Sequence, residues 1–202
     1  MHTMNKKFRS LILAAVSLAS LGFASLASRA AVETYAIDSV HSNVAFSIRH
    51  FVSKVPGNFT KLSGTIKVDR ENLEKSIVNA IIDVSSVTTS NDARDKHLKS
   101  DAFFDVAKYP TARFVSIAWK KTGENTFDIT GDLTIHGITK SVVLNAELLG
   151  FGAGMEGVQL SGWQATTTLK RSDFGMSGPA VLGAALGDEV AITINVEADL
   201  KK

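Results

Sequence analysis

The chain has 202 residues, of which 45% are hydrophobic and 21% are charged, and this composition is typical of a folded chain of one domain. It contains no cysteine, which excludes a disulfide, a thiolate metal site and the acylated cysteine of a lipoprotein. The formal charge is +2, from 22 basic and 20 acidic side chains.

The first 30 residues are predicted to be a secretory signal peptide. A basic start at 6–9 (KKFR) is followed by an apolar run over 11–26 and by a small-x-small cleavage pattern at 28–30 (Ser-Arg-Ala). Serine and glycine interrupt the run, which is shorter than the roughly 20 apolar residues that span a membrane. We therefore expect cleavage after Ala30, export to the periplasm and no stable membrane anchor.

Removal of this leader changes the charge balance. The leader holds four basic residues and no acid, so residues 31–202 carry 18 basic and 20 acidic side chains, a balance of −2. Net charge therefore indicates neither a nucleic-acid partner nor an anionic membrane surface. The remaining 172 residues are enough for one domain that buries about 70% of the surface exposed by the unfolded chain.

Beyond the leader, apolar and polar residues alternate with a period of two, as in strands with one buried face. The pattern is clearest over 190–200, where every second residue from Val190 to Leu200 is apolar. It recurs in seven further segments, at 44–48, 66–68, 78–84, 112–114, 127–129, 142–148 and 163–169. The sequence therefore predicts eight main strands.

Short connections predict that these strands pair antiparallel in sequence order. At His136-Gly137, for example, glycine supplies the positive φ that a tight hairpin turn requires. Eight long strands leave two exposed edges unless the sheet closes. The pattern favours an up-and-down barrel, and it leaves a two-sheet sandwich open as the alternative.

Residues 91–105 interrupt the alternation and are predicted to form a short helical insertion. Ser90 or Asn91 can cap its start, and Pro110 prevents its continuation. The aromatic residues around this insertion suggest a plug that packs onto one end of the barrel: Phe103, Phe104, Tyr109 and Phe114.

Two glycine-rich segments match nucleotide-binding motifs only in part. Residues 152–157 (GAGMEG) fit G-x-G-x-x-G but precede another strand pattern, so we predict a hairpin loop instead of a dinucleotide site. Residues 178–187 lack the lysine of a P-loop and are predicted to be an apolar loop before the last strand. No G-x-S-x-G elbow is present, so a serine nucleophile of the α/β-hydrolase type is not supported.

Four segments together cover nearly the whole chain beyond the leader: YAIDSVHSNVAFSIRH at 35–50, RDKHLKSDAFFDVAKYPTARF at 94–114, GDLTIHGITKSVVL at 131–144 and LKRSDFG at 169–175. Their order and spacing resemble the YceI family of bacterial lipocalin-like polyisoprenoid-binding proteins. Asp38, His41 and Ser42 match an Asp-x-x-His-Ser hallmark of that family. The resemblance implies an all-β fold, an eight-stranded antiparallel lipocalin-like β-barrel over residues 31–202 with a short helical insertion around residues 91–105.

The resemblance also implies a ligand, a polyisoprenoid or another long apolar molecule such as an isoprenoid quinone or its precursor. An eight-stranded barrel has an interior just wide enough for side chains or for one slender ligand. Small residues within the predicted strands favour room inside: Ala45, Ala80, Ala112, Ala146, Ala165 and Ala198. A linear prenyl chain suits such a bore because it is thin and apolar.

Candidate ligand-binding residues fall into two groups. The apolar lining is expected from Phe46, Phe103, Phe104, Phe114, Trp163 and Phe174. A pyrophosphate or quinone head group is expected at the barrel mouth, near cations from the set Arg49, Arg94, His97 and Arg171. The histidines show no recognised metal-ligand spacing, so neither a metal nor a cofactor is expected.

Three functions stay open at this point. The first is a non-catalytic periplasmic carrier of an isoprenoid lipid. The second is an enzyme that acts on an amphiphilic molecule, with Asp101 and Asp105, or His41 with Asp38, as acid and base. The third is a stress-response interaction protein whose barrel is fully packed, and homodimer formation is left open for all three.

Overall fold

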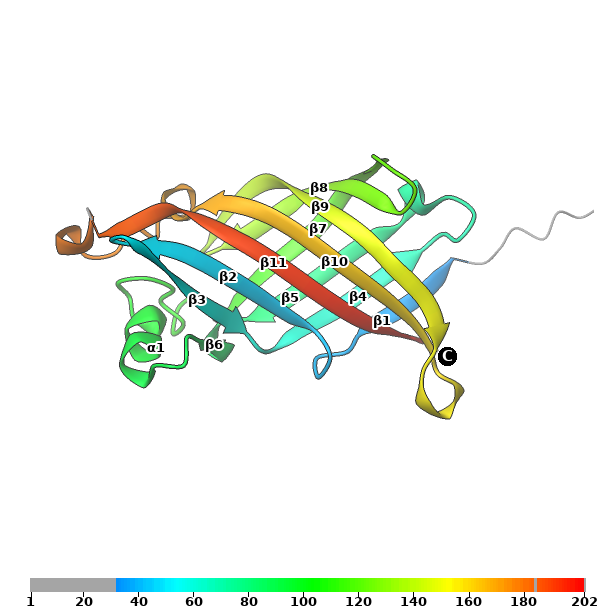
Figure 1. Cartoon of the computed structure of the whole chain (residues 1–202), viewed down its shortest axis with the longest axis horizontal. Helices are drawn as coiled ribbons and strands as arrows, with labels where there is room; N and C mark the ends of the chain where they lie inside the picture. The colour runs from blue at the N-terminus through cyan, green and yellow to red at the C-terminus, as the bar shows by residue number, and fades with distance from the viewer. Residues whose placement is uncertain (1–31, 184, 202) are drawn as a thin grey trace, which may run out of the picture.

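Eight strand positions close into an antiparallel barrel in the computed structural model, which describes residues 32–183 and 185–201 (Figure 1). The strands are β1 (Glu33–Ile37), β2 (Asn43–His50), β3 (Ser53–Phe59), β4 (Leu62–Val68), β5 (Ile77–Asp83), β6 (Val87–Thr88), β7 (Thr111–Lys121), β8 (Thr126–Ile135), β9 (Ile138–Ala153), β10 (Gln159–Lys170) and β11 (Leu186–Leu200). They fill eight positions because β1/β2, β3/β4 and β5/β6 are each one interrupted strand. The expected leader, residues 1–30, lies outside the described residues.

The barrel has up-and-down topology. Each position pairs antiparallel with the next one along the chain, and β11 closes the ring by pairing with both β1 and β2. Closure removes the exposed sheet edges that eight strands would otherwise leave. The predicted all-β, eight-stranded barrel is therefore confirmed, and the two-sheet sandwich is not what forms.

The first strand position is interrupted at residues 38–42, between β1 and β2. There the Ser42 hydroxyl donates a hydrogen bond to the Glu197 carbonyl and accepts one from the Glu197 N–H, both at 3.1 Å. The Asp38 N–H donates to the same carbonyl at 2.9 Å. These bonds satisfy backbone groups of β11 that the interrupted ladder leaves without a strand partner.

Two hairpins follow the prediction. His136 and Gly137 both have positive φ, 51° and 73°, and they join β8 to β9 with Ile135 paired to Ile138. Residues 154–158 join β9 to β10, with a single 3-10 turn η3 (Met155–Gly157). The GAGMEG segment is thus a hairpin connection, as its following strand pattern indicated.

A helix covers one end of the barrel beside β3 and β6 (Figure 1). It is α1 (Asp92–Lys99), with the Asn91 side chain accepting from the Arg94 N–H at 3.0 Å. The Ser100 hydroxyl donates to the His97 carbonyl at 2.7 Å and the helix ends there, so the predicted insertion at 91–105 is helical only over its first part. No helix in the described part of the chain is long and apolar enough to cross a membrane.

The opposite end of the barrel, here called the closed end, is sealed by buried aromatic residues. Tyr35, Phe127, Trp119 and Trp163 are all less than a tenth exposed. The Arg70 guanidinium lies 3.7 Å from the centre of the Phe151 ring and donates to Glu33 and to the Tyr35 hydroxyl. The interior is therefore closed at the end that carries the C-terminus and leads toward the α1 end.

Candidate ligand-binding site

The inward faces of the strands enclose one long cavity of about 480 Å³. This volume lies within the range of roughly 300–1,000 Å³ that is usual for small-molecule sites. The wall is almost entirely apolar because the inward positions of each strand are the apolar ones of its alternating pattern, as Val190, Ile192, Ile194 and Val196 of β11 illustrate. The cavity opens at the α1 end, here called the mouth.

All six residues predicted for the apolar lining lie on the wall of this cavity: Phe46, Phe103, Phe104, Phe114, Trp163 and Phe174. The Phe59 ring links two of them, since it lies 5.7 Å from the Phe46 ring and 5.5 Å from the Phe104 ring. The segment after α1 thus packs Phe103 and Phe104 into the mouth, as the predicted plug requires, whereas Tyr109 of the same prediction lies against the His136 ring outside the lining. Their contact with a ligand stays a prediction.

Small side chains on the strands leave the space that forms the cavity. Four of the six alanines noted in the sequence line the cavity: Ala80, Ala112, Ala146 and Ala165. Ala165 of β10 is paired in register with Ala146 of β9, so two methyl side chains lie next to each other on the wall. Ala45 and Ala198 are not part of the lining.

Of the four cations predicted for a head group, three line the mouth and one does not. Arg94, His97 and Arg171 belong to the cavity wall. Arg49 is exposed on the outer face of β2, because its neighbours Ile48 and His50 are the residues that point inward. His50 is therefore a mouth residue that was not predicted, one position away from the predicted Arg49.

The two arginines of the mouth are already engaged in holding loops. Arg94 donates to the hydroxyl and the carbonyl of Thr89 at 2.7 and 2.9 Å. Arg171 donates to the carbonyls of Met176 and Gly187 at 2.7 and 2.8 Å, and also to that of Ser177. Their fixed positions favour recognition of an anionic or carbonyl head group without further ordering of the side chain.

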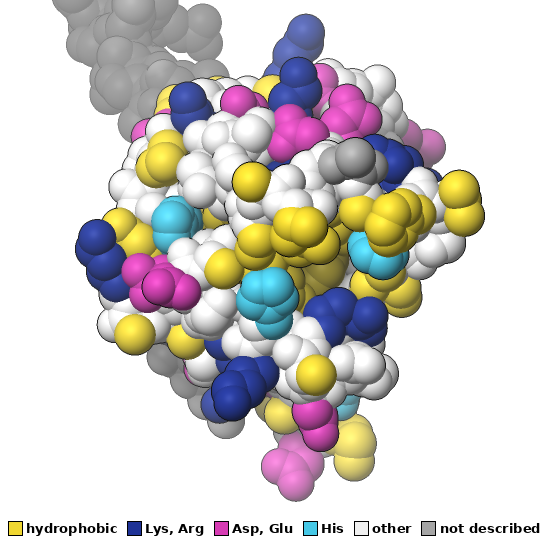
Figure 2. All heavy atoms as spheres, turned by 90° about the vertical axis from the view of Figure 1, so that its left-hand side faces the viewer, with side chains coloured by type: hydrophobic (Ala, Val, Ile, Leu, Met, Phe, Trp, Pro, Cys, Tyr) yellow, Lys and Arg dark blue, Asp and Glu magenta, His cyan; other side chains and the backbone are white. Residues whose placement is uncertain are grey.

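The imidazole rings of the two mouth histidines have aromatic contacts but form no hydrogen bonds within the described residues. The His97 ring meets Phe103 edge-on at 5.1 Å, and the His50 ring meets Phe51 in the same way at 4.8 Å. An imidazole in this position has its nitrogens available for a polar group of a ligand. Figure 2 looks into this end and shows apolar side chains around a hollow, with histidine and basic side chains at its edge.

Trp119 is a lining residue that sequence reasoning did not single out. The reason is a register shift in β7 between Ser116 and Ala118, which leaves the exposed Ile117 as an extra residue. The bulge moves the inward face by one position, so Trp119 points inward where strict alternation from Phe114 would select Ala118. Its ring meets Trp163 edge-on at 5.5 Å.

Residues 35–198 match the YceI-like domain. The chain belongs to the YceI-like family. A UPF0312 protein of Pseudomonas savastanoi pv. phaseolicola is 41% identical over 176 residues, which cover 85% of this chain and 92% of the relative. Among solved structures, Burkholderia cenocepacia BcnA is similar with a TM-score of 0.73 and 26% identity, over 80% of this chain and 99% of BcnA.

A second solved structure has the same fold at lower sequence identity. It is a polyisoprenoid binding domain from Saccharophagus degradans, described as implicated in plant cell wall breakdown, with a TM-score of 0.63 and 16% identity. The matched region covers 83% of this chain and 98% of that domain. At this identity the likeness extends to the barrel alone.

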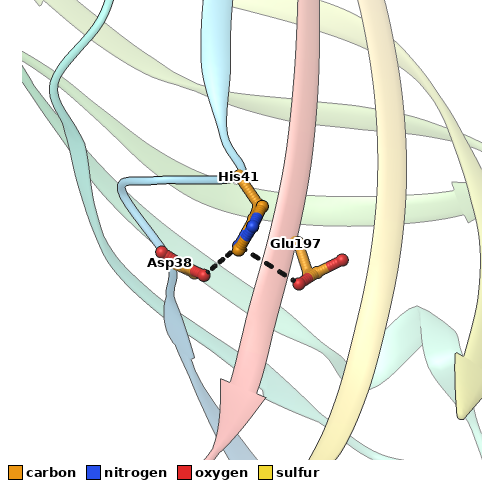
Figure 3. Close-up of side chains that lie close together, drawn as sticks. All are labelled: Asp38, His41 and Glu197. Carbon is orange, nitrogen blue, oxygen red and sulfur yellow. Dashed lines mark hydrogen bonds and ion pairs between the residues drawn. The ribbon is translucent and has the colours of Figure 1, made fainter. Parts of the chain in front are cut away.

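Two hallmark residues of this YceI-like chain, Asp38 and His41, form a polar cluster with Glu197 on the outer surface, away from the cavity lining (Figure 3). His41 Nδ1 lies 2.6 Å from Asp38 Oδ2 and 3.5 Å from Glu197 Oε1. Asp38 also accepts from the Val40 N–H at 2.7 Å, so it closes the turn between β1 and β2. The cluster is therefore explained by its structural role in this turn.

The residues considered for the enzyme hypothesis do not meet at the cavity. Asp38 and His41 belong to the surface cluster, and Asp101 and Asp105 lie in the turns after α1. None of the four is part of the cavity wall. A reaction at these groups would have to take place outside the barrel.

The Asp38–His41 pair makes the cluster sensitive to pH. Its hydrogen bond and charge raise the pKa of His41, and the same hydrogen bond, with that of the Val40 N–H, lowers the pKa of Asp38. The His41 contribution to stability is complete below its unfolded pKa and is lost as pH rises through the raised folded value. The Asp38 contribution is complete above its unfolded pKa and is lost as pH falls through the lowered one.

We therefore expect the pair to be fully formed between about pH 4 and 6.5, the unfolded pKa values of the two groups. Replacement of Asp38 by asparagine should lower the titration midpoint of His41, measured by NMR from the imidazole proton shifts. Ser39→Ala, an exposed neighbour, is the control and should leave the midpoint in place. An unchanged midpoint in Asp38→Asn would contradict the pairing.

Proposed function

We propose that this protein binds a long isoprenoid lipid inside its barrel and carries it through the periplasm. The observation that carries the proposal is the cavity itself, about 480 Å³ with an almost entirely apolar wall, closed at one end and with its arginine and histidine side chains at the mouth. The polyisoprenoid binding domain from S. degradans has the same fold, which supports extending its ligand class to this chain. Export rests on the leader predicted at 1–30.

The shape of the cavity favours one orientation of such a lipid. An apolar chain would enter tail first and end against the buried aromatic residues of the closed end, such as Trp119 and Trp163. The head group, a pyrophosphate, a quinone ring or a hydroxyl, would remain at the mouth beside His50, His97 and Arg94. Arg171 holds the loop that forms the other side of the mouth.

Apolar burial is sufficient for useful affinity. Each buried CH₂ group contributes about 0.8 kcal/mol, so an isoprenoid chain of a few units offsets the loss of translational and conformational freedom on binding. We expect a Kd of about 1 μM or tighter. A fully packed barrel with an interaction role fits the structure less well, because native interiors rarely leave a continuous space of this size.

The chain provides its own reporter for the test. It contains two tryptophans, and both line the cavity. Addition of an isoprenoid quinone, which quenches indole fluorescence at close range, should therefore quench the protein with saturation at one equivalent. Native mass spectrometry of protein purified from its own periplasm, followed by lipid extraction, should identify a stoichiometric prenyl lipid. Protein that emerges empty and takes up neither quinones nor prenyl pyrophosphates would contradict the proposal.

A further inference from the structure

The turn between β2 and β3 is unusual in both residue type and exposure. It is a two-residue connection, Phe51-Val52, between the paired residues His50 and Ser53. The Phe51 side chain is 61% exposed and the Val52 side chain is fully exposed. From this turn, and resting on the proposed function, we propose that the mouth of the barrel docks onto the surface of an anionic phospholipid bilayer, with Phe51 and Val52 inserted among the lipids.

Local stability does not explain these residues. Two-residue hairpins favour asparagine and glycine because positive φ is required, yet Phe51 has a φ of 48°. Such a backbone conformation is strained for a bulky side chain, and exposure to water forgoes the stabilisation that burial of either residue would give. The turn at His136-Gly137, which joins β8 to β9, shows that the fold accommodates the favoured residue type at the same end of the barrel. A position that violates two local preferences is expected to have a function.

The flanking charges indicate the kind of surface. Arg49 and Lys54 lie directly opposite each other in the β2–β3 ladder, and both are exposed. Like charges in this arrangement are destabilising. Neither side chain forms an ion pair within the described part of the chain. An anionic surface would neutralise both, although the mature chain as a whole carries a slight negative charge.

The turn is also continuous with the cavity. His50 lines the mouth, and the Phe51 N–H donates to the Ala185 carbonyl at 2.6 Å, which joins the turn to the loop before β11. That loop exposes Val181, which is 87% exposed, beside the lining residue Leu182. Apolar side chains therefore run from the turn into the hollow seen in Figure 2. A lipid that leaves a bilayer at this point would enter the barrel without crossing water.

A bilayer fits this surface better than a second copy of the chain. The lipids proposed as ligands reside in membranes, and a carrier must collect them there. Two copies that met mouth to mouth would bring the Arg49 and Lys54 pairs of both toward one another. An amphipathic tip with aromatic and basic residues is instead typical of interfacial membrane binding.

The test measures vesicle binding and ligand binding separately. Protein purified from its own periplasm is floated with vesicles of phosphatidylcholine, either alone or mixed with phosphatidylglycerol. Quinone binding from solution is measured separately by tryptophan quenching. We expect wild type to float with the mixed vesicles. Phe51→Ser with Val52→Ser should reduce the bound fraction about tenfold, and Arg49→Gln with Lys54→Gln should remove the preference for phosphatidylglycerol. Met155→Ser, which changes an exposed apolar residue in the η3 turn, should behave as wild type.

Quinone binding from solution should be the same in all these variants, because none of the changed side chains lines the cavity. Wild type that binds quinone but floats with neither vesicle would overturn the docking proposal and leave the proposed function intact. A dimer that Phe51→Ser with Val52→Ser converts to monomer, without vesicle binding, would overturn it in favour of a second copy. Flotation without quinone binding would instead support docking and contradict the proposed ligand.

Discussion

Ala165→Phe is expected to abolish binding of an isoprenoid lipid while leaving the barrel folded. The Ala165 side chain lines the cavity and lies next to Ala146 on the neighbouring strand. A phenyl group there projects into empty space, so it occupies the path of the ligand without displacing a packed side chain. We expect the Kd for a short-chain quinone to rise at least about 100-fold, because the ligand loses apolar contact over several CH₂ groups.

Two measurements define this result. Tryptophan quenching gives the affinity, and the urea midpoint should be unchanged or raised, since the new side chain becomes buried in an existing cavity. Ala191→Phe is the matched control, because Ala191 is exposed on the outer face of β11. The control should bind quinone as wild type does. Normal binding by folded Ala165→Phe would place the ligand outside the barrel and remove the basis of the proposed function.

Much of the fold follows from the alternation of apolar and polar residues with a period of two. The alternation over 190–200 predicts a long inward face, and β11 presents Val190, Ile192, Ile194 and Val196 of that face to the cavity. The helical insertion was also predictable, because Asn91 is a good cap and Pro110 cannot continue a helix. Strands and helices were predicted correctly where the residue types favour the backbone conformation that the fold requires.

The sequence is less informative where the pairing of strands decides which face of a strand a side chain occupies. The bulge at Ile117 places Trp119 inside, and nothing in the local composition of β7 indicates an extra residue there. At the mouth, the positive charge of Arg49 suggested a head-group contact, although its place in the alternation directs it outward and His50 inward. A strict count from Phe46 would have identified His50. The engagement of Arg94 and Arg171 with loop backbone depends on long-range contacts that no sequence motif predicts.

The interruption of the first strand shows why the family hallmark is informative about structure. The Ser42 hydroxyl donates one hydrogen bond to the Glu197 backbone and accepts another from it. In an uninterrupted strand, the backbone of the neighbouring strand would make these two bonds. Asp38 and His41 fix the turn that makes this possible. The hallmark therefore identifies a barrel closed at a defined register, and the cavity residues determine what that barrel can hold.

Phe127→Ala is expected to have the opposite effect to Ala165→Phe, with stability lost and ligand binding kept. Phe127 is 1% exposed and its ring lies 5.8 Å from that of Trp119, at the closed end of the barrel. Its removal leaves a void beside strands that cannot collapse because they are hydrogen-bonded on both sides. The free energy of unfolding should fall by about 3–5 kcal/mol, the usual cost of Phe→Ala in a core.

The measurement is a urea titration of both proteins, with Phe127→Leu as a smaller truncation that should lose less. Phe127 is not part of the cavity wall, so the quinone affinity of the folded fraction should remain close to that of wild type. A loss below about 1 kcal/mol would mean that the closed end is not packed as a core. If the destabilised variant gains affinity for longer prenyl chains, the sealed aromatic end is what limits the chain length that the cavity accepts.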